Sequence, residues 1–371
     1  MAVFCRDVME AVEKIAPREL SEKWDNVGLL VGSPAEKVGK IIVALDVTPE
    51  VVNEALQEDA DMIVSHHPLI FKPLTHVRTD TPIGNMLFKL IKNNIQVYAA
   101  HTNLDYCELG TNYFLAQKLG LGEAEILQPA EERLYKIVVF VPRGYEDAVR
   151  DAMGDAGAGW IGNYSHCSFM ALGTGTFKPL EGADPFIGSK GILEKVEELR
   201  LETIVPESLK NKVVRAMIKA HPYEEVAYDV YRLENNGGRN GLGRIGYLKE
   251  EMALYDFGEK VKRDLGIKHV KLVGPIQKAV RKVAVCAGAG ALAISAAKKK
   301  GADVFVSGDI KYHEALEAQQ EGLALVDAGH YATEWAAVPA LAEYLQKELN
   351  STEQKVQILV SQIKTDPWEV I

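Results

Sequence analysis

Cysteine is scarce in this sequence. The 371 residues include four cysteines, Cys5, Cys107, Cys167 and Cys286, and no two of them form a C-x-x-C pair. Scattered thiols of this kind are typical of a reducing cytoplasm, and they argue against a disulfide framework or a thiolate zinc site. We therefore treat all four as packing residues and expect a cytoplasmic protein.

Long apolar runs and an excess of positive charge are also missing. No apolar stretch approaches the roughly 20 residues of a membrane-spanning helix, and Arg6 and Asp7 come too early for a signal peptide. The formal charge is −10, whereas a general nucleic-acid binder normally shows a basic face. We expect neither a membrane nor a nucleic acid as a partner.

Length and composition predict a globular protein of about two domains. Within it, strand and helix signals alternate over residues 40–119. Lys40–Asp46 has the pattern of a buried strand. Thr48 and Thr81 each precede a proline, which predicts two helix starts with threonine as the cap. Further strands end near His66 and His101, and a helix is expected from about Thr111 to Leu119. Strands joined by helices predict a mainly parallel sheet with flanking helices, an α/β fold.

The same alternation resumes after about Gly246. The expected strands are Val270–Val273, Val283–Cys286, Val304–Val306, Leu323–Val326 and Val356–Val360. The expected helices are Leu254–Asp264, Leu292–Lys300, His313–Gln320 and Thr333–Leu349.

The middle of the chain has a different order of elements. It reads as strand Leu134–Val141, helix Tyr145–Ala156, strands Phe169–Phe177 and Val196–Val205, helix Pro206–Ala220 and strand Val226–Leu233. This β-α-β-β-α-β order is ferredoxin-like. Gln128-Pro129 and Asn235–Gly241 supply chain breakers at its two edges. We therefore predict a split core domain, residues 1–127 and 238–371, and an inserted ferredoxin-like α+β domain over residues 128–237.

Side chains that bind divalent metals stand at the ends of three strand-like segments. His66 and His67 close one apolar run, Asp105 follows a second, and His330 with Glu334 follows a third. An α/β protein builds its site in this way, from distant strand ends. Each residue also has an ordinary interpretation, as a structural histidine, a turn cap or an i,i+4 polar pair. All five together fit a metal site better than five coincidences.

The donor types indicate which metals and how many. Three imidazoles and two carboxylates form a mixed nitrogen and oxygen set, which suits zinc, manganese, iron(II) or cobalt. Five ligands exceed what one tetrahedral ion needs, so we expect two divalent ions per chain, bridged by Glu334. His66 and His67 point to opposite sides of a strand and would serve different ions.

Four further residues are candidates for supporting this site. His101 is expected to orient a water or a ligand, with an ordinary polar strand end as the alternative. Asp46 either lines the same crevice or caps the helix after Thr48. Asp309 and His313 follow another strand and are candidates for substrate contact.

Two glycine patterns resemble nucleotide-binding loops. Gly241-Leu-Gly243-Arg-Ile-Gly246 runs from a polar loop into a strand, so we interpret it as the return from the inserted domain. Gly288–Ala293 follows a strand and opens a helix, where backbone amides are able to hold an anion; the alternative is a tight turn. We expect no nucleotide cofactor, since one would not explain the histidines.

Six motifs in combination resemble those of the Ngg-interacting factor 3 family, whose bacterial members are called GTP cyclohydrolase 1 type 2 homologues. The motifs are Trp24–Leu29, Leu45–Thr48, Ser65–Pro68, His101–Asp105, Ser307–His313 and Asp327–Glu334. The resemblance covers the whole chain. It implies a dinuclear metal centre held by the five residues above and a homohexamer, a trimer of dimers. It also implies the long bacterial form, with an insert similar to PII and CutA proteins.

Two functions of different classes are compatible with these features. The first is a dinuclear metal-dependent hydrolase of a small nucleotide-like or heterocyclic substrate. The second is a metal-binding regulatory or interaction protein whose inserted domain senses a ligand. The name of the bacterial members suggests opening of a guanine ring, but the true cyclohydrolases of the main class include cysteine among their zinc ligands, and none stands in this set.

Overall fold

A computed structural model describes residues 2–130, 133–162, 164–236, 240–350 and 355–370. The chain divides into two compact units, Met1–Ala130 with Arg239–Ile371, and Glu131–Gly238. We call the first the core unit and the second the inserted unit. Among the described residues, no helix has both the length and the apolar character needed to cross a membrane.

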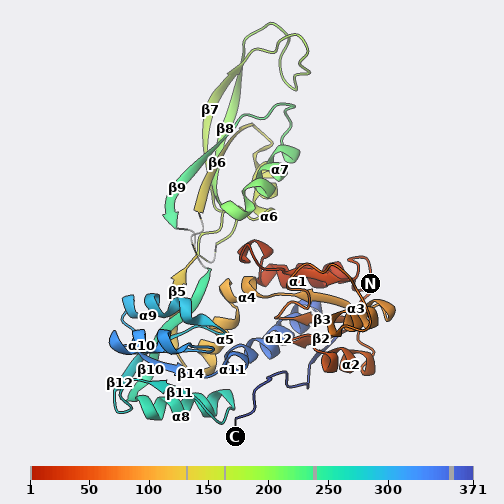
Figure 1. Cartoon of the computed structure of the whole chain (residues 1–371). Helices are drawn as coiled ribbons and strands as arrows, with labels where there is room; N and C mark the ends of the chain where they lie inside the picture. Colours follow the sequence, from red (N-terminus) through yellow and green to blue (C-terminus); the bar gives the residue numbers. More distant parts are fainter. Residues whose placement is uncertain (1, 131–132, 163, 237–239, 351–354, 371) are drawn as a thin grey trace. The chain divides into compact units, whose positions relative to one another are not determined.

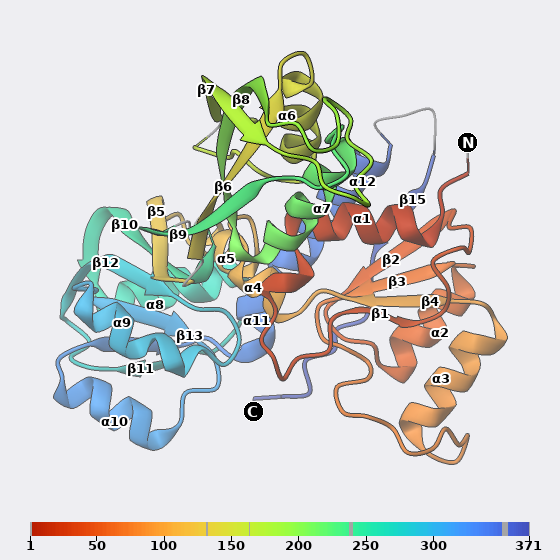
Figure 2. The same ribbon diagram turned by 90° about the horizontal axis from the view of Figure 1, so that it is seen from above.

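The first sheet of the core unit is built from the N-terminal half of the chain and one C-terminal strand. Its order is β1 (Gly28–Val31), β4 (Gln96–Ala99), β3 (Met62–Ser65), β2 (Lys40–Ala44) and β15 (Gln357–Val360). The strands from β4 to β15 are parallel, and β1 is antiparallel to β4. Helices α1 (Cys5–Ile15) and α12 (Ala337–Leu349) cover one face, while α2 (Pro49–Gln57) and α3 (Pro82–Lys92) cover the other (Figure 2).

Helices α2 and α3 begin where the threonine-proline pairs predict. The side chain of Thr48 accepts a hydrogen bond from Val51 N, and that of Thr81 accepts one from Gly84 N. Pro49 and Pro82 occupy the first helical turn, where the missing N–H removes no helix hydrogen bond.

The second sheet of the core unit has both parallel and antiparallel pairs. Its order is β11 (Lys271–Val273), β14 (Ala324–Asp327), β13 (Val304–Ser307), β12 (Ala279–Val285), β10 (Gly241–Ala253) and β5 (Gly122–Pro129). Only β14, β13 and β12 run parallel. Helices α5 (Thr111–Lys118) and α8 (Leu254–Leu265) pack on one face, and α9 (Ile294–Lys299) and α10 (Tyr312–Gln320) on the other. The core unit therefore has two mixed sheets where the sequence predicts one mainly parallel sheet.

The first boundary signal, Gln128-Pro129, lies in a strand of this second sheet, whereas the second, Asn235–Gly241, runs from the end of β9 in the inserted unit to the start of β10, with residues 237–239 outside the described residues. Pro129 ends β5, an edge strand, where a missing N–H costs no ladder bond. The glycines of the Gly241–Gly246 pattern lie in β10, between β5 and β12. Arg244 in that pattern is buried, and its guanidinium donates to the carbonyls of Gly241, Gly243, Cys107 and Glu108. The pattern is the return from the inserted unit, as the sequence predicts, and it forms part of a paired strand.

Helices α4 (Thr102–Tyr106), α5, α11 (His330–Trp335) and α12 lie between the two sheets (Figures 1 and 2). The sequence predicts a single helix over residues 333–349. The structure instead begins α11 at His330 and separates it from α12 at Ala336.

The inserted unit is one antiparallel sheet with two helices. Its elements are β6 (Arg133–Pro142), α6 (Glu146–Asp155), β7 (Ser168–Phe177), β8 (Glu194–Pro206), α7 (Lys210–Ala220) and β9 (Tyr228–Asn236). The strand order is β7-β8-β6-β9 (Figure 1). Val149, Met153, Val213 and Met217 of the helices pack against alternate residues of β6 and β8. Short 3-10 helices at Arg18–Leu20, Glu207–Leu209 and Gly290–Ala293 complete the described secondary structure.

Candidate metal centre

The carboxyl ends of parallel strands bring the candidate ligands to one place in the core unit. His66 and His67 follow β3, and their backbone N–H groups donate to Ala44 O and Leu45 O beside the end of β2. The turn after β4 leads into α4, which carries Asp105. From the second sheet, the turn after β14 leads into α11, which carries His330 and Glu334. The two sheets thus contribute opposite sides of one cluster.

Each candidate histidine is oriented through its Nδ1 atom. The contacts from Nδ1 are 2.8 Å to Ala100 O for His66, 2.8 Å to Asp46 Oδ1 for His67 and 2.8 Å to Asp309 Oδ2 for His330. Because Nδ1–H donates in each case, the neutral imidazole carries its lone pair on Nε2. The Nε2 atoms of His67 and His330 lie 3.4 Å apart, so the lone pairs converge.

Glu334 lies among all three imidazoles. Its Oε1 atom is 3.2 Å from His330 Nε2 and 3.7 Å from His66 Nε2, and its Oε2 atom is 3.2 Å from His67 Nε2. Asp105 contributes a second carboxylate, with Oδ1 3.6 Å from His66 Nε2. A carboxylate with both oxygens facing different imidazoles has the position that a bridging ligand needs.

Two atoms of this cluster lack partners. Among the described residues, His66 Nε2 and Glu334 Oε2 are buried and make no hydrogen bond of acceptable geometry. A buried polar atom without a hydrogen bond lowers the stability of the fold by about 1–3 kcal/mol. The Nδ1 atoms of the three histidines, in contrast, all have hydrogen-bond partners. A divalent cation would satisfy both atoms, and two groups of side chains are close enough to hold one: His66, His67 and His101, and His67, His330 and Glu334.

The charges of the cluster favour a cation. Burial lowers the pKa of His67, but the hydrogen bond to Asp46 and the close carboxylate of Glu334 outweigh it and raise the pKa to about 10. The hydrogen bond to Glu334 raises the pKa of His330 to about 9. Burial opposes ionisation of Glu334, yet the surrounding imidazoles, His66 above all, hold its pKa well below the usual range. The carboxylates therefore create a negative field in which metal ions compete with protons for the imidazoles.

The nearby cysteines do not join the donor set. Burial raises the pKa of Cys107 to about 12, and it raises that of Cys286 as well. Both remain neutral thiols at physiological pH, whereas metal binding requires a thiolate. The available donors are nitrogen and oxygen, which fits zinc, manganese, iron(II) or cobalt.

Three of the four supporting candidates lie beside the cluster. Asp46 and Asp309 hold His67 and His330, and the latter aspartate adopts a left-handed backbone with φ of 53°. The ring of His101 lies 5.2 Å from that of His66 between centroids. His313 is exposed on α10, and its ring contacts Tyr312 instead of the cluster in the described part of the chain.

Asp25 is a functional candidate that the sequence did not assign. Its buried carboxylate accepts from His101 Nδ1 at 2.9 Å and from the backbone N–H of Thr102 at 3.1 Å. The motif Trp24–Leu29 pointed to this loop but not to a role. The partners are 76 and 77 residues away in the sequence, so no spacing rule connects them.

Gly288 has a role that its glycine pattern did not suggest. A Cβ atom there would lie 2.1 Å from Glu334 Oε1, so only glycine allows this carboxylate its position. The amides of Gly288 and Gly290 donate to Thr333 Oγ1 and Ser307 Oγ. Since both N–H groups are engaged within the protein, the tight-turn interpretation of Gly288–Ala293 is favoured over anion binding.

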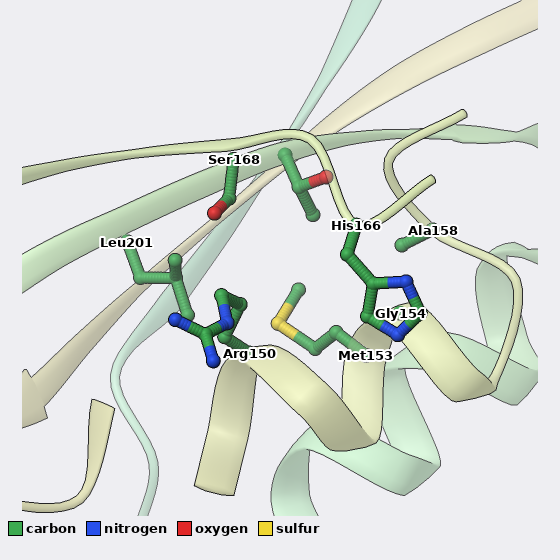
Figure 3. A pocket seen from close by; sticks show the side chains of 8 residues that line it. Arg150, Met153, Gly154, Ala158, His166, Ser168 and Leu201 are labelled. Atoms are coloured by element: carbon green, nitrogen blue, oxygen red, sulfur yellow. The ribbon is translucent and has the colours of Figure 1, made fainter. Parts of the chain in front are cut away.

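The inserted unit contains a small pocket of its own. Arg150, His166 and Ser168 line it together with Met153, Gly154 and Leu201 (Figure 3). The guanidinium of Arg150 is already paired with Asp147 and Asp151. The His166 ring lies so close to Gly154 that a Cβ at Gly154 would be 2.0 Å from it. The pocket therefore offers little free charge or space for a ligand.

Comparisons with known proteins agree over the whole chain. The model of the family DUF34/NIF3 (NGG1p interacting factor 3) matches residues 3–367. A Halalkalibacterium halodurans protein called GTP cyclohydrolase 1 type 2 homolog is 47% identical, over 98% of both chains. A Bacillus subtilis protein of the same name is 45% identical, over 98% of this chain and 97% of the other.

Solved structures show the same similarity. A Bacillus cereus protein related to NIF3 has a TM-score of 0.89 and 47% identity, with all of both chains covered. A Staphylococcus aureus protein has a TM-score of 0.80 and 31% identity, over 100% of this chain and 99% of the other.

Proposed function

Because the chain belongs to the DUF34/NIF3 family, we propose that its core unit holds two divalent ions and hydrolyses a small nucleotide-like or heterocyclic substrate. The observation that carries this proposal is the buried cluster of three imidazoles and two carboxylates, in which His66 Nε2 and Glu334 Oε2 make no hydrogen bond within the protein. Zinc is the first expected metal, with manganese, iron(II) and cobalt as alternatives.

The side chains divide naturally between two ions. His66 and Asp105 would hold the first ion and His67 and His330 the second, with Glu334 shared between them. Asp46 and Asp309 fix the ring orientations of His67 and His330. A divalent ion bound at such a site lowers the pKa of a water toward about 7 and polarises the group to be cleaved.

His101 is suited to handle a proton beside these ligands. Its Nδ1–H donates to the buried carboxylate of Asp25, so its Nε2 atom is free to accept a hydrogen bond from a water or a substrate. Asp25 acts through His101 and is a positioning residue.

Fewer observations support the proposed substrate class than support the proposed metal site. The Halalkalibacterium halodurans and Bacillus subtilis relatives carry the name GTP cyclohydrolase 1 type 2 homolog. A nucleotide-like or other nitrogen heterocycle is compatible with that name and with the exposed aromatic rings near His101. The name alone does not establish cyclohydrolase activity for this chain.

We also propose that the inserted unit is a ferredoxin-like domain of the PII and CutA kind. Its β-α-β-β-α-β order and its strand order β7-β8-β6-β9 support this, because the two central strands are the first and third of the unit. In this proposal the core unit carries the metal chemistry, the inserted unit supports assembly into a hexamer, and the protein works in the cytoplasm.

Metal analysis and turnover on the same samples test the proposal. Protein stripped with a chelator and reconstituted with zinc, manganese or iron(II) should bind two ions per chain and hydrolyse at least one compound in a panel of nucleotides and heterocycles. Glu334→Ala should impair both metal positions, and Asp105→Ala at least one. His313→Ala, which removes an exposed histidine, is the matched control and should retain both ions and activity.

The outcomes separate the two candidate functions. One ion per chain that is unaffected by Glu334→Ala contradicts the dinuclear site. Two ions without metal-dependent turnover across the panel favour the regulatory or interaction protein, in which the inserted unit would sense a ligand.

A further inference from the structure

Three aromatic rings lie together at the edge of the candidate metal centre. The indole of Trp24 is 5.9 Å from the ring of Phe71 and 6.2 Å from that of His101, and Phe71 is 6.4 Å from His101. Trp24 is 60% exposed and Phe71 46% exposed. Two large apolar side chains are thus left in solvent side by side.

The backbone around these rings is firmly held. Next to Trp24, the carboxylate of Asp25 accepts hydrogen bonds from His101 Nδ1 and from the backbone N–H and the hydroxyl of Thr102. On the other side, Asn26 Nδ2 donates to the carbonyl of Ile70, which directly precedes Phe71. The two exposed rings are therefore supported by paired polar groups on both loops, which is the arrangement of a preformed binding surface.

The ring of His101 connects this surface with the metal ligands. It lies 5.2 Å from His66 and 5.3 Å from His67, while its other neighbours are Trp24 and Phe71. A molecule that covers the exposed pair is therefore next to the histidines of the proposed centre. The aromatic pair is therefore beside the proposed metal centre, with His101 between them.

We propose that Trp24 and Phe71 form a stacking subsite for the planar ring of a heterocyclic substrate. The inference rests on the proposed function and specifies which part of the substrate the protein recognises. Aromatic faces stack on any flat π system and tolerate different ring substituents, whereas a flexible acyl chain has no π face to stack. The subsite selects for flatness and leaves the choice of scissile group to the metal centre.

Tryptophan fluorescence gives a readout that does not depend on turnover. The full-length protein, metal-free and zinc-loaded, is titrated with guanosine monophosphate and, as the matched probe without a planar base, with ribose 5-phosphate. Guanosine monophosphate should quench emission in a saturable manner, and ribose 5-phosphate should not. Trp24→Leu should remove this quenching, and Trp160→Leu, which removes an indole that is 55% exposed in the inserted unit, should not.

Equilibrium dialysis then measures affinity independently of the fluorophore. Trp24→Leu and Phe71→Leu should each weaken binding of guanosine monophosphate by about 5- to 150-fold, the range for losing one stacked ring. Thermal melts and bound zinc should match the wild type, since both side chains are exposed.

Four results would overturn the subsite. The first is equal affinity of Trp24→Leu and Trp160→Leu for guanosine monophosphate, and the second is equal affinity of the wild type for the two probes. The third is that zinc-loaded protein does not bind guanosine monophosphate. The fourth is that iodide does not quench the fluorescence of Trp24, which would mean that a second copy of the chain covers it. Binding of guanosine monophosphate that requires Trp24 in a protein unable to hold zinc supports the subsite and contradicts the proposed function. Failure of the stacking subsite is therefore distinguishable from failure of the proposed metal-dependent function.

Discussion

At Gly288 the backbone passes close to Glu334 in a left-handed conformation. The φ angle is 64°, and an added Cβ atom would lie 2.1 Å from Glu334 Oε1. We expect Gly288→Ala to push this carboxylate out of the cluster and to lower metal affinity about 10- to 100-fold, the usual effect of disturbing a ligand's support. Chelator competition on the purified variant measures this change.

Gly301 provides the control for backbone strain. Its φ is 70°, but no atom lies within 4 Å of the position of a Cβ. Gly301→Ala should therefore cost stability, of the order of 1 kcal/mol, and leave metal binding unchanged. If Gly288→Ala and Gly301→Ala both bind metal with wild-type affinity, metal binding does not depend on the position that the Glu334 carboxylate has in the structure.

The sequence predicted which residues form the cluster better than it predicted which residues hold their neighbours in position. The positions of His66, His67, Asp105, His330 and Glu334 at element ends suffice to bring them together, and the structure does so. That they bind metal stays a prediction. The role of Asp25 could not be predicted, because a hydrogen bond between a loop and a strand end 76 residues later leaves no local pattern.

At the scale of elements, local signals were reliable where local chemistry decides. Thr48-Pro49 and Thr81-Pro82 begin helices because capping and the proline ring act within one turn. The strand β5 and the start of β10 before Ile245 were missed because glycine and proline are normally breakers, whereas here the pairing of β5 with β10 and of β10 with β12 outweighs that tendency. Such pairing is non-local and cannot be read from a single segment.

The turn after α7 contains a histidine whose neutral form the fold requires. His221 Nε2–H donates to Phe140 O, and its Nδ1 accepts from the backbone N–H of Tyr223. Burial lowers the pKa of this histidine below 6.5. The unfolded chain therefore takes up the proton first, so the inserted unit loses stability as the pH falls below about 6.5 and through the lower folded pKa.

Hydrogen exchange within the inserted unit tests this expectation. Protection of the Tyr223 amide and of β6 should decrease between about pH 7 and about pH 5 after correction for the intrinsic exchange rate. His221→Gln should flatten this dependence, and the exposed His313→Gln should not alter it. A wild-type protection that is constant over this range would show that His221 does not require its neutral form.

At the scale of the whole chain, the inserted unit leaves and re-enters the core at neighbouring positions. Gly241 of β10 is paired with Pro129 of β5, so the two ends of the core are adjacent in the same sheet. We expect that replacing residues 131–238 by a short linker yields a folded core that still binds metal, measured by circular dichroism and elemental analysis. An unfolded product would mean that the core needs the inserted unit and that the two are not separate domains.

The edges of the sheet in the inserted unit suggest that the chain assembles into an oligomer. The four-stranded sheet of the inserted unit ends at β7 and β9, which have no further strand beside them among the described residues. Phe169 and Leu172 on β7 and Tyr231 on β9 are largely exposed. Free edges with exposed apolar residues favour association with another copy.

We therefore expect a homohexamer, as the family resemblance implies, in which inserted units associate in threes and core units in pairs. A threefold contact and a twofold contact together close a set of six chains without leaving an unused interface. Light scattering at micromolar concentration should give a mass of about six chains for the full-length protein. The variant without residues 131–238 should retain only the twofold contact and give a mass of two shortened chains. A monodisperse full-length monomer contradicts the hexamer, and a hexamer that persists without the inserted unit would place the threefold contact in the core.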